Sequence, residues 1–328
     1  MRATLVRYHE RSDFPSPDPR HRARWQERRQ TLEQSPFIHS TPDGLVSDAG
    51  GRVRELVMMG ARMTMRAFGF HGPASRAAAR VELVRHAVRL SNLPNELEGY
   101  RILHVSDPHF DGLPGLAEAI VQAVGGEPVD LGLFGGDYRF AGRGPFRETA
   151  VLRDLARVTK GIRPRDGWLG VLGNHDTHDM AGPIERLGVR LLVNESVRIR
   201  LGRARLLVAG VDDVHRFFTE AAVTALDPPE STLDEVGIAL VHSPELAPEA
   251  AAAGYHLYLC GHTHGGQLRP VLGRPLTTHL HRCKRLAAGT WRLDGMHGYT
   301  SRGAGTSGIP LRWNCPGEIT LFTLTRGH

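Results

Sequence analysis

Short apolar runs that alternate with helical stretches dominate the chain from about residue 99 onward. "RILHVS", "DLGLFGG", "GWLGVLG" and "VGIALVH" are apolar runs of strand length, which is typical of strands buried on both faces of a sheet. Between them lie helical patterns in "PGLAEAIVQAV", "PFRETAVLRDLARV" and "PELAPEAAAAG", whereas "VRIRL" and "EITLFTL" alternate as antiparallel strands do. This order predicts an α/β domain with a mixed sheet, or two packed sheets with helices outside.

The N-terminal part of the chain differs in composition and lacks the short apolar runs of the later part. Residues 1–50 are rich in Arg, Pro and Ser and predict a basic, poorly ordered extension, although "HRARWQERRQTLEQ" could form a short basic helix. Residues 51–94 are expected to form a helical, amphipathic segment. Within it, residues 53–70 mix apolar side chains with arginines, so they either pack on the domain or contact a membrane surface. The main domain is expected over residues 95–328.

Composition narrows the class of protein. The chain has 328 residues, of which 41% are hydrophobic and 23% charged, as in soluble globular proteins. A formal charge of +6 favours anionic partners such as phosphorylated metabolites, nucleic acid or acidic lipid. The three cysteines form no CxxC pair, which argues against a disulfide framework and a structural zinc site. Without a long apolar run or a secretory signal, a cytoplasmic location is expected, with peripheral attachment to the inner membrane face as the alternative.

Residues that can bind metals follow five of the predicted strands, where each strand ends. The segments are "DPH", "GGD", "GNHD", "VHS" and "GHTH". Because a site in an α/β sheet usually lies at the carboxyl ends of its strands, five such endings predict one site. Asp, Asn and His supply oxygen and nitrogen ligands without thiolate, which suits Mn²⁺, Fe or Zn²⁺. The ligands are too many for one ion, whereas two ions bridged by a shared carboxylate would use them all.

The same five segments, in this order, resemble the signature of the calcineurin-like metallophosphoesterases over roughly residues 95–326. The resemblance implies a four-layer αββα sandwich of two mixed sheets with a binuclear metal centre. It also implies a division of the metal ligands between two ions. Asp107, His109 and His264 would bind one ion, Asn174, His242 and His262 would bind the other, and Asp137 would bridge both.

Further residues are expected to act on the substrate. By the same resemblance, His175 would contact the phosphate and protonate the leaving oxygen, with Asp176 orienting it. Arg139 and Arg302 lie just beyond motif strands, where they could contact a substrate phosphate or instead form surface or internal ion pairs. The "DD" of "GVDDVH" is expected to be a turn.

These expectations point to a two-metal phosphohydrolase, a phosphodiesterase or pyrophosphatase that cleaves a P–O bond with hydroxide generated at the ions. Manganese is the expected metal, with iron and zinc as alternatives. "GHTHGGQ" and "YTSRGAGTSGIPLRWNCPGEI" resemble a bacterial branch that includes membrane-associated phosphodiesterases and the UDP-2,3-diacylglucosamine pyrophosphatase type. The substrate is therefore expected to be a phosphorylated small molecule or a lipid-linked one. A metal-dependent nuclease, acting on nucleic acid, and a non-catalytic scaffold of the same fold are the alternatives.

Overall fold

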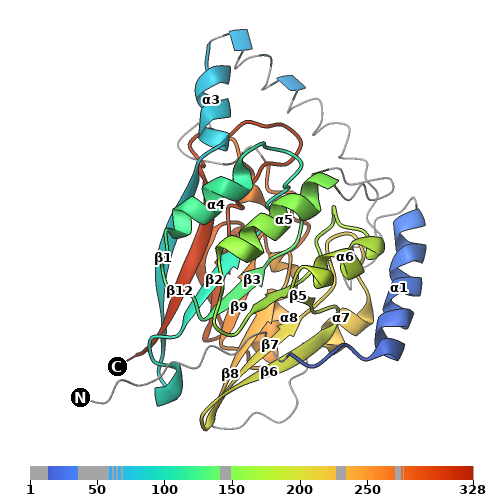
Figure 1. Ribbon diagram of the computed structural model, residues 1–328, viewed down its shortest axis with the longest axis vertical. Helices are drawn as coiled ribbons and strands as arrows, with labels where there is room; N and C mark the ends of the chain where they lie inside the picture. The colour runs from blue at the N-terminus through green and yellow to red at the C-terminus, as the bar shows by residue number, and fades with distance from the viewer. Residues whose placement is uncertain are drawn as a thin grey trace.

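Two stacked sheets form the centre of the protein, and helices cover their outer faces (Figure 1). The computed structural model describes residues 14–35, 59–60, 63, 66–67, 69–140, 149–226, 234–269, 275 and 277–327. Each sheet has six strands and is mixed. This confirms the fold class expected from the sequence.

The first sheet carries the strands that lead into three of the motif loops. β1 pairs parallel with β12, β12 pairs antiparallel with β2, and the strands from β2 to β5 are parallel. In spatial order its members are β1 (Val81–Leu90), β12 (Gly317–Arg326), β2 (Arg101–Val105), β3 (Leu131–Phe134), β4 (Trp168–Gly170) and β5 (Val189–Leu191).

The second sheet leads into the other two motif loops. β11, β9, β8 and β7 are parallel, and each edge strand pairs antiparallel with its neighbour. In spatial order its members are β10 (Gly289–Leu293), β11 (Met296–Thr300), β9 (Leu257–Cys260), β8 (Glu235–Leu240), β7 (Ala204–Gly210) and β6 (Glu195–Leu201).

Alternating side chains divide the core into three layers. In β2, Ile102 packs between the two sheets, whereas Leu103 and Val105 pack on the opposite face against helices. α4 (Leu116–Val124), α5 (Thr149–Gly161) and α6 (Ala181–Arg186) cover this outer face, as Figure 1 shows. The short helices α7 (Glu220–Thr224) and α8 (Ala247–Ala252) cover the second sheet. Burial on both faces explains why the central strands are apolar throughout.

Two N-terminal helices and several single-turn helices complete the described chain. α1 (Pro19–Gln34) and α3 (His71–Ala78) precede the first strand. Single-turn helices are η2 (Asn95–Leu97), η3 (His178–Met180), η4 (Pro244–Leu246), η5 (His264–Gly266) and η6 (Lys284–Leu286). None of the helices in the described part of the chain is both long enough and apolar enough to cross a bilayer.

The N-terminal part departs from its expected organisation in two places. Residues 19–34 form α1, which contains the short basic helix considered for residues 21–34. The helix does not belong to a poorly ordered extension, because Trp25, Arg29 and Leu32 are buried against the domain. Residues 81–90, expected within a helical segment, form β1, because all ten pair with β12. Most of the amphipathic stretch 53–70 lies outside the described residues.

Candidate metal centre

The five motif loops meet at one edge of the sandwich, at the carboxyl ends of β2, β3, β4, β8 and β9. Backbone hydrogen bonds join the first two loops, because the N–H of Asp107 donates to the Gly136 carbonyl and that of His109 to the Asp137 carbonyl, both at 3.0 Å. His242 Nδ1 lies 2.8 Å from the Gly135 carbonyl and so ties the second sheet to the first. Residues more than 150 positions apart in sequence therefore share one site.

Backbone conformation aims the side chains into this site. Five of the expected ligands have positive φ angles, which are uncommon for residues with a Cβ and cluster at functional sites. They are Asp107 (51°), His109 (43°), Asp137 (57°), His262 (69°) and His264 (50°). Neighbouring glycines are also required, because a Cβ at Gly173 would collide with the Asp137 carboxylate and one at Gly261 with that of Asp107.

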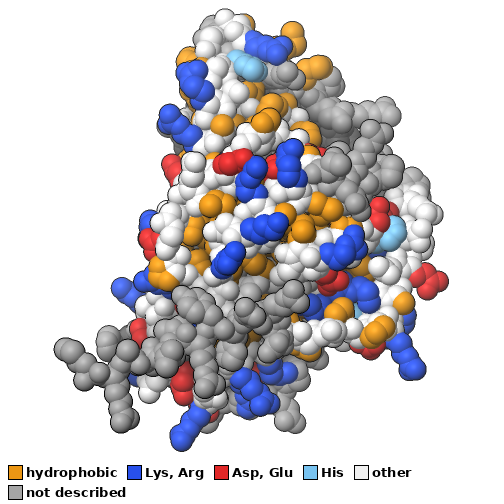
Figure 2. Space-filling view, in the orientation of Figure 1, with side chains coloured by type: hydrophobic (Ala, Val, Ile, Leu, Met, Phe, Trp, Pro, Cys, Tyr) orange, Lys and Arg blue, Asp and Glu red, His pale blue; other side chains and the backbone are white. Residues whose placement is uncertain are grey.

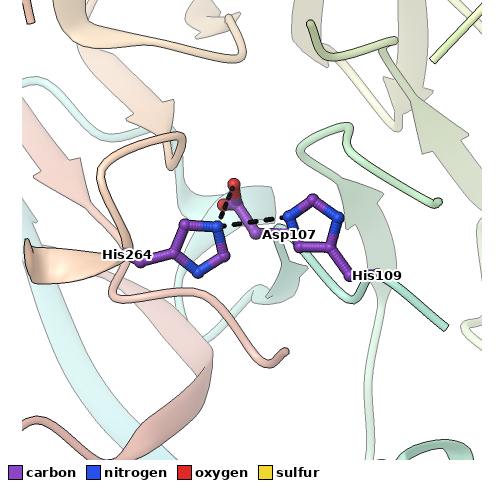
Figure 3. A group of neighbouring side chains, drawn as sticks. All are labelled: Asp107, His109 and His264. Carbon is purple, nitrogen blue, oxygen red and sulfur yellow. Dashed lines mark hydrogen bonds and ion pairs between the residues drawn. The ribbon is translucent and has the colours of Figure 1, made fainter. Parts of the chain in front are cut away.

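One group of ligands consists of Asp107, His109 and His264 (Figure 3). His109 Nε2 and His264 Nε2 lie 3.2 Å apart, and His264 Nε2 is 3.5 Å from Asp107 Oδ1. His109 Nδ1 is 2.7 Å from the Arg139 carbonyl, to which only a protonated Nδ1 can donate. This contact leaves the Nε2 lone pair directed into the group, which is the usual arrangement for a histidine that binds a metal.

A second group lies beside the first and contains Asp137, Asn174, His242 and His262. Asn174 Oδ1 is 3.0 Å from His242 Nε2 and 2.8 Å from His262 Nδ1. Asp137 Oδ2 is 3.4 Å from His242 Nε2 and 3.6 Å from His109 Nε2 in the first group. One carboxylate oxygen therefore borders both groups, as a bridging ligand would.

The protonation of these side chains, except that of His242, suits cation binding. Burial lowers the pKa of His109 to about 4 and that of His262 and His264 well below the usual histidine range, so their lone pairs are available. Burial would raise the pKa of Asp137, but His242 and His175 outweigh it and hold that pKa well below the usual range. Burial likewise opposes a charge on His242, yet Asp137 and Asp107 raise its pKa, so a metal must displace this proton.

His175 borders the two groups without belonging to either. Its backbone N–H donates to Asp137 Oδ1 at 2.8 Å, and its Nδ1 lies 2.8 Å from the Phe140 carbonyl. Nε2 is therefore the remaining polar atom of the ring. His175 lines a cavity of about 190 Å³ together with Asp137, Asn174, His262 and His264.

Asp176 has a different role from the one expected. Its carboxylate does not contact the His175 ring but accepts backbone N–H groups of Asp137 and Gly173 at 2.8 Å and of Tyr138 at 2.9 Å. The expected orienting role is corrected to a structural one, because the Phe140 carbonyl holds His175 instead. Asp176 joins the loop after β3 to the loop after β4.

The two expected substrate arginines do not line the cavity. Arg139 is 3% exposed, and its Nε donates to the His175 carbonyl at 2.6 Å. Arg302 is paired with Glu318 and lies 3.3 Å from Glu82, which agrees with an internal ion pair. Neither position supports direct contact with a substrate phosphate.

Other residues at the site were missed from the sequence. His215, Arg216 and His279 line the cavity beyond the ligand groups. The turn expected at "GVDDVH" is present, and buried Asp213 accepts the backbone N–H groups of the cavity residues His215 and Arg216 at 3.2 and 2.8 Å. The signal was present, because "GVDDVH" follows β7 in the same way that the motif loops follow their strands.

Comparisons with known proteins agree with this geometry. A family profile described as calcineurin-like phosphoesterase matches residues 100–266. Phosphodiesterase YaeI of Escherichia coli is 29% identical over 254 residues, covering 74% of this chain and 88% of the relative. The uncharacterized metallophosphoesterase YkuE of Bacillus subtilis is 27% identical over 251 residues, covering 74% and 85%.

Among solved structures, an archaeal phosphodiesterase is 11% identical and covers 62% of this chain and 84% of its own, with a TM-score of 0.34. The family match spans all five motif loops, and those loops converge on the two ligand groups. On this match and this convergence, the chain belongs to the calcineurin-like phosphoesterase family.

Proposed function

We propose that this protein is a binuclear metal-dependent phosphodiesterase or pyrophosphatase. The observation that carries the proposal is Asp137 Oδ2, which lies within 3.6 Å of ligand nitrogens from both groups. The donor set of carboxylate, amide and imidazole fits two divalent ions, for which we propose Mn²⁺ with Fe and Zn²⁺ as alternatives. Bound there, such ions supply Lewis-acid stabilisation of phosphoryl oxygens and an activated water.

The protein's own side chains would orient the substrate. With Nδ1–H held by the Phe140 carbonyl, His175 Nε2 faces the substrate and would donate a proton to the leaving oxygen from the doubly protonated ring. The cavity, at about 190 Å³, is smaller than the clefts that enclose whole drug-sized ligands. It suits the phosphoryl group itself, so the rest of the substrate would extend past His215 and Arg216 toward solvent.

A substrate screen tests this proposal. Purified protein loaded with Mn²⁺ is assayed on bis-p-nitrophenyl phosphate, p-nitrophenyl phosphate, nucleotides, lipid-linked pyrophosphates and DNA. We expect turnover of the diester or of a pyrophosphate, lost in Asp137→Asn. Turnover of DNA alone would favour a nuclease. Two bound ions without turnover of any substrate would favour a scaffold and would contradict the proposal.

A lipid-linked substrate is supported by one surface feature. Met59, Met63 and Phe70 are 54%, 67% and 48% exposed, and Arg66 is exposed among them. Hydrophobic and basic side chains lie close together at the end of the molecule that carries α3 (Figure 2). Apolar burial and attraction of arginine to headgroups would add at an anionic membrane.

Vesicle binding tests this contact. Wild-type protein should sediment with vesicles containing anionic lipid, less so at high salt and not with neutral vesicles, since salt screens the electrostatic part. The double substitution Met59→Ser and Met63→Ser should weaken binding while leaving turnover of a small soluble diester unchanged. Equal binding by both proteins would contradict the membrane contact. Point substitutions are preferable to removing residues 1–70, because that truncation also removes α1.

A further inference from the structure

α1 packs beside the metal centre although it precedes the motif loops by many residues. Figure 1 shows it alongside α6 and α7, at the flank of the sandwich. The helix lies outside the residues that match the family profile, which begin at residue 100. Its buried side chains are Trp25, Arg29 and Leu32, and Arg29 is 0% exposed.

Arg29 contacts the loop that carries Asn174 and His175. Its Nη2 donates to the Gly173 carbonyl at 3.2 Å and to the Asp176 carbonyl at 2.8 Å. These two carbonyls directly flank the metal ligand Asn174 and the cavity residue His175. One guanidinium therefore holds both ends of the four-residue turn from which these two side chains extend.

The same helix also holds the loop after β7. Arg29 Nη1 donates to the carboxylate of Asp212, which also accepts Trp25 Nε1 at 2.8 Å. The next residue, Asp213, accepts the backbone N–H groups of the cavity residues His215 and Arg216. α1 thus connects a loop of the first sheet with a loop of the second.

A third contact attaches α1 to the loop after β4 at a further residue. Glu33 accepts the backbone N–H of His178 at 2.8 Å and lies 2.8 Å from His178 Nδ1. Glu33 also lies 3.2 Å from Arg29 Nε, one helical turn away. The loop after β4 is therefore held by α1 at Gly173, Asp176 and His178.

The charge and burial of Arg29 indicate that this residue does more than attach α1 to the domain. A buried guanidinium loses its hydration, and burial alone would lower the pKa of Arg29. Asp212, Asp213 and Glu33 outweigh this effect and raise the pKa, so the side chain stays charged. The Phe217 ring lies 3.7 Å from the guanidinium and adds a cation–π contact. An apolar residue could seat α1 without this desolvation, but it could not bind two loop carbonyls.

We propose that α1 is a positioning element of the active site and that Arg29 is its positioning residue. By fixing the Gly173 and Asp176 carbonyls, Arg29 sets the place of Asn174 at the second metal and of His175 at the substrate. The proposal rests on the proposed metal centre for its functional consequence. Its structural content, a turn held by a distant arginine, is independent of that centre.

Arg29→Met is compared with Arg22→Met as a matched control. Arg22 lies on the same helix but anchors it to Glu185 at 2.9 Å and to the Leu191 carbonyl at 3.1 Å, away from the motif loops. Both variants should lower the melting temperature. Only Arg29→Met should weaken binding of the second metal and lower kcat, each by roughly 10–100-fold, the usual effect of removing a residue that orients metal ligands.

Arg29→Lys serves as the conservative variant. It keeps the charge but lacks the planar fork, so it should recover part of the metal affinity and part of kcat. It also replaces Arg29→Met if that variant does not fold. All variants are assayed at a temperature at which circular dichroism shows them fully folded.

Hydrogen exchange separates failure of this proposal from failure of the proposed function. Amides of residues 173–178 should exchange faster in Arg29→Met than in wild type, and should be unchanged in Arg22→Met, whether or not the protein hydrolyses any substrate. Equal exchange in the two variants would overturn the proposal. Metal affinity and kcat that fall equally in both variants, in proportion to stability, would overturn it as well.

Discussion

Asp176→Asn separates the structural role of this carboxylate from a role in orienting His175. The substitution keeps the shape of the side chain but replaces one acceptor oxygen by an NH₂ donor. Asp176 Oδ2 accepts the N–H groups of Asp137 and Gly173, and Oδ1 accepts that of Tyr138. Whichever way the amide is turned, a buried N–H faces another donor.

The magnitude follows from these contacts. If the NH₂ takes the place of Oδ1, the Tyr138 N–H and the Arg139 N–H, the latter in a long contact of 3.4 Å, lose their acceptor, which costs about 1–3 kcal/mol. The two remaining bonds become neutral and lose about 1 kcal/mol each. These lost contacts amount to about 3–5 kcal/mol, but the substitution also removes a buried charge that Asp137 repels. The raised pKa of Asp176, about 7 against 3.8 for an ordinary Asp, means that this charge costs the folded state about 4 kcal/mol at about pH 8.5. The two effects offset each other, so the free energy of unfolding of the metal-free protein should change by less than about 2 kcal/mol.

Urea unfolding of metal-free protein measures this change. Burial and Asp137 raise the pKa of Asp176 to about 7, so the comparison is made at about pH 8.5, where the carboxylate is charged. Asp179→Asn is the control, because Asp179 is exposed in the same segment and should change stability by less than about 0.5 kcal/mol. Metal affinity should also fall in Asp176→Asn, because the Asp137 loop loses its anchor.

One outcome would refute this reasoning. If Asp176→Asn keeps its metal content but reproduces the leaving-group dependence of a His175 variant, Asp176 acts through His175 after all. The structural account would then be wrong, and the role implied by the family resemblance would be right.

Two further predictions concern single histidines. His175→Asn should keep its metals but lower kcat by about 10²–10⁴, less for p-nitrophenolate than for poor leaving groups; equal losses would contradict the acid role. Burial, and to a lesser extent the nearby His242, lower the pKa of His104 to about 3. Below about pH 6.5 the unfolded chain therefore binds a proton at His104 that the folded protein does not bind. Stability should therefore fall as the pH drops from about 6.5, and between pH 7 and 5 His104→Leu should lose about 2 kcal/mol less than wild type in urea unfolding.

The metal centre was predictable because its residues follow a simple rule. Asp107, Asp137, Asn174, His242 and His262 each follow an apolar strand, and parallel strands bring their carboxyl ends to one edge. The five motif loops therefore converge in the structure as their order along the chain indicated. The same strands predicted cover on both faces but left one mixed sheet or two packed sheets open, and the four-layer arrangement was implied by the family resemblance.

The packing of α1 and the strand β1 could not be predicted in this way, although a short basic helix over residues 21–34 was considered. α1 has little apolar periodicity, because its attachment depends on Arg29 and Trp25 binding loop carbonyls and a carboxylate 144 or more residues away. In β1, charged residues interrupt the apolar ones without a strict alternation, and only pairing with β12 at the other end of the chain makes the segment a strand. Both elements are determined by partners that no local pattern reveals.

The role of Asp176 was mispredicted for a related reason. Its place in "GNHD" puts it next to His175 in sequence, but the direction of its carboxylate is set by backbone N–H groups of the loop after β3. Those donors become neighbours only after the two loops pack together. The direction of the Arg302 side chain is likewise set by a residue distant in sequence, because its guanidinium forms an ion pair with Glu318 on β12.

The number of metal ions per chain tests the central claim most directly. Protein loaded with Mn²⁺ and freed of excess metal is measured by elemental analysis and by electron paramagnetic resonance, for wild type and for Asp137→Asn. The bridging position of Asp137 predicts two ions per wild-type chain with a spin-coupled spectrum, and loss of both the coupling and most of the metal in the variant. One isolated ion per wild-type chain, or two coupled ions retained in Asp137→Asn, would contradict the two-metal account.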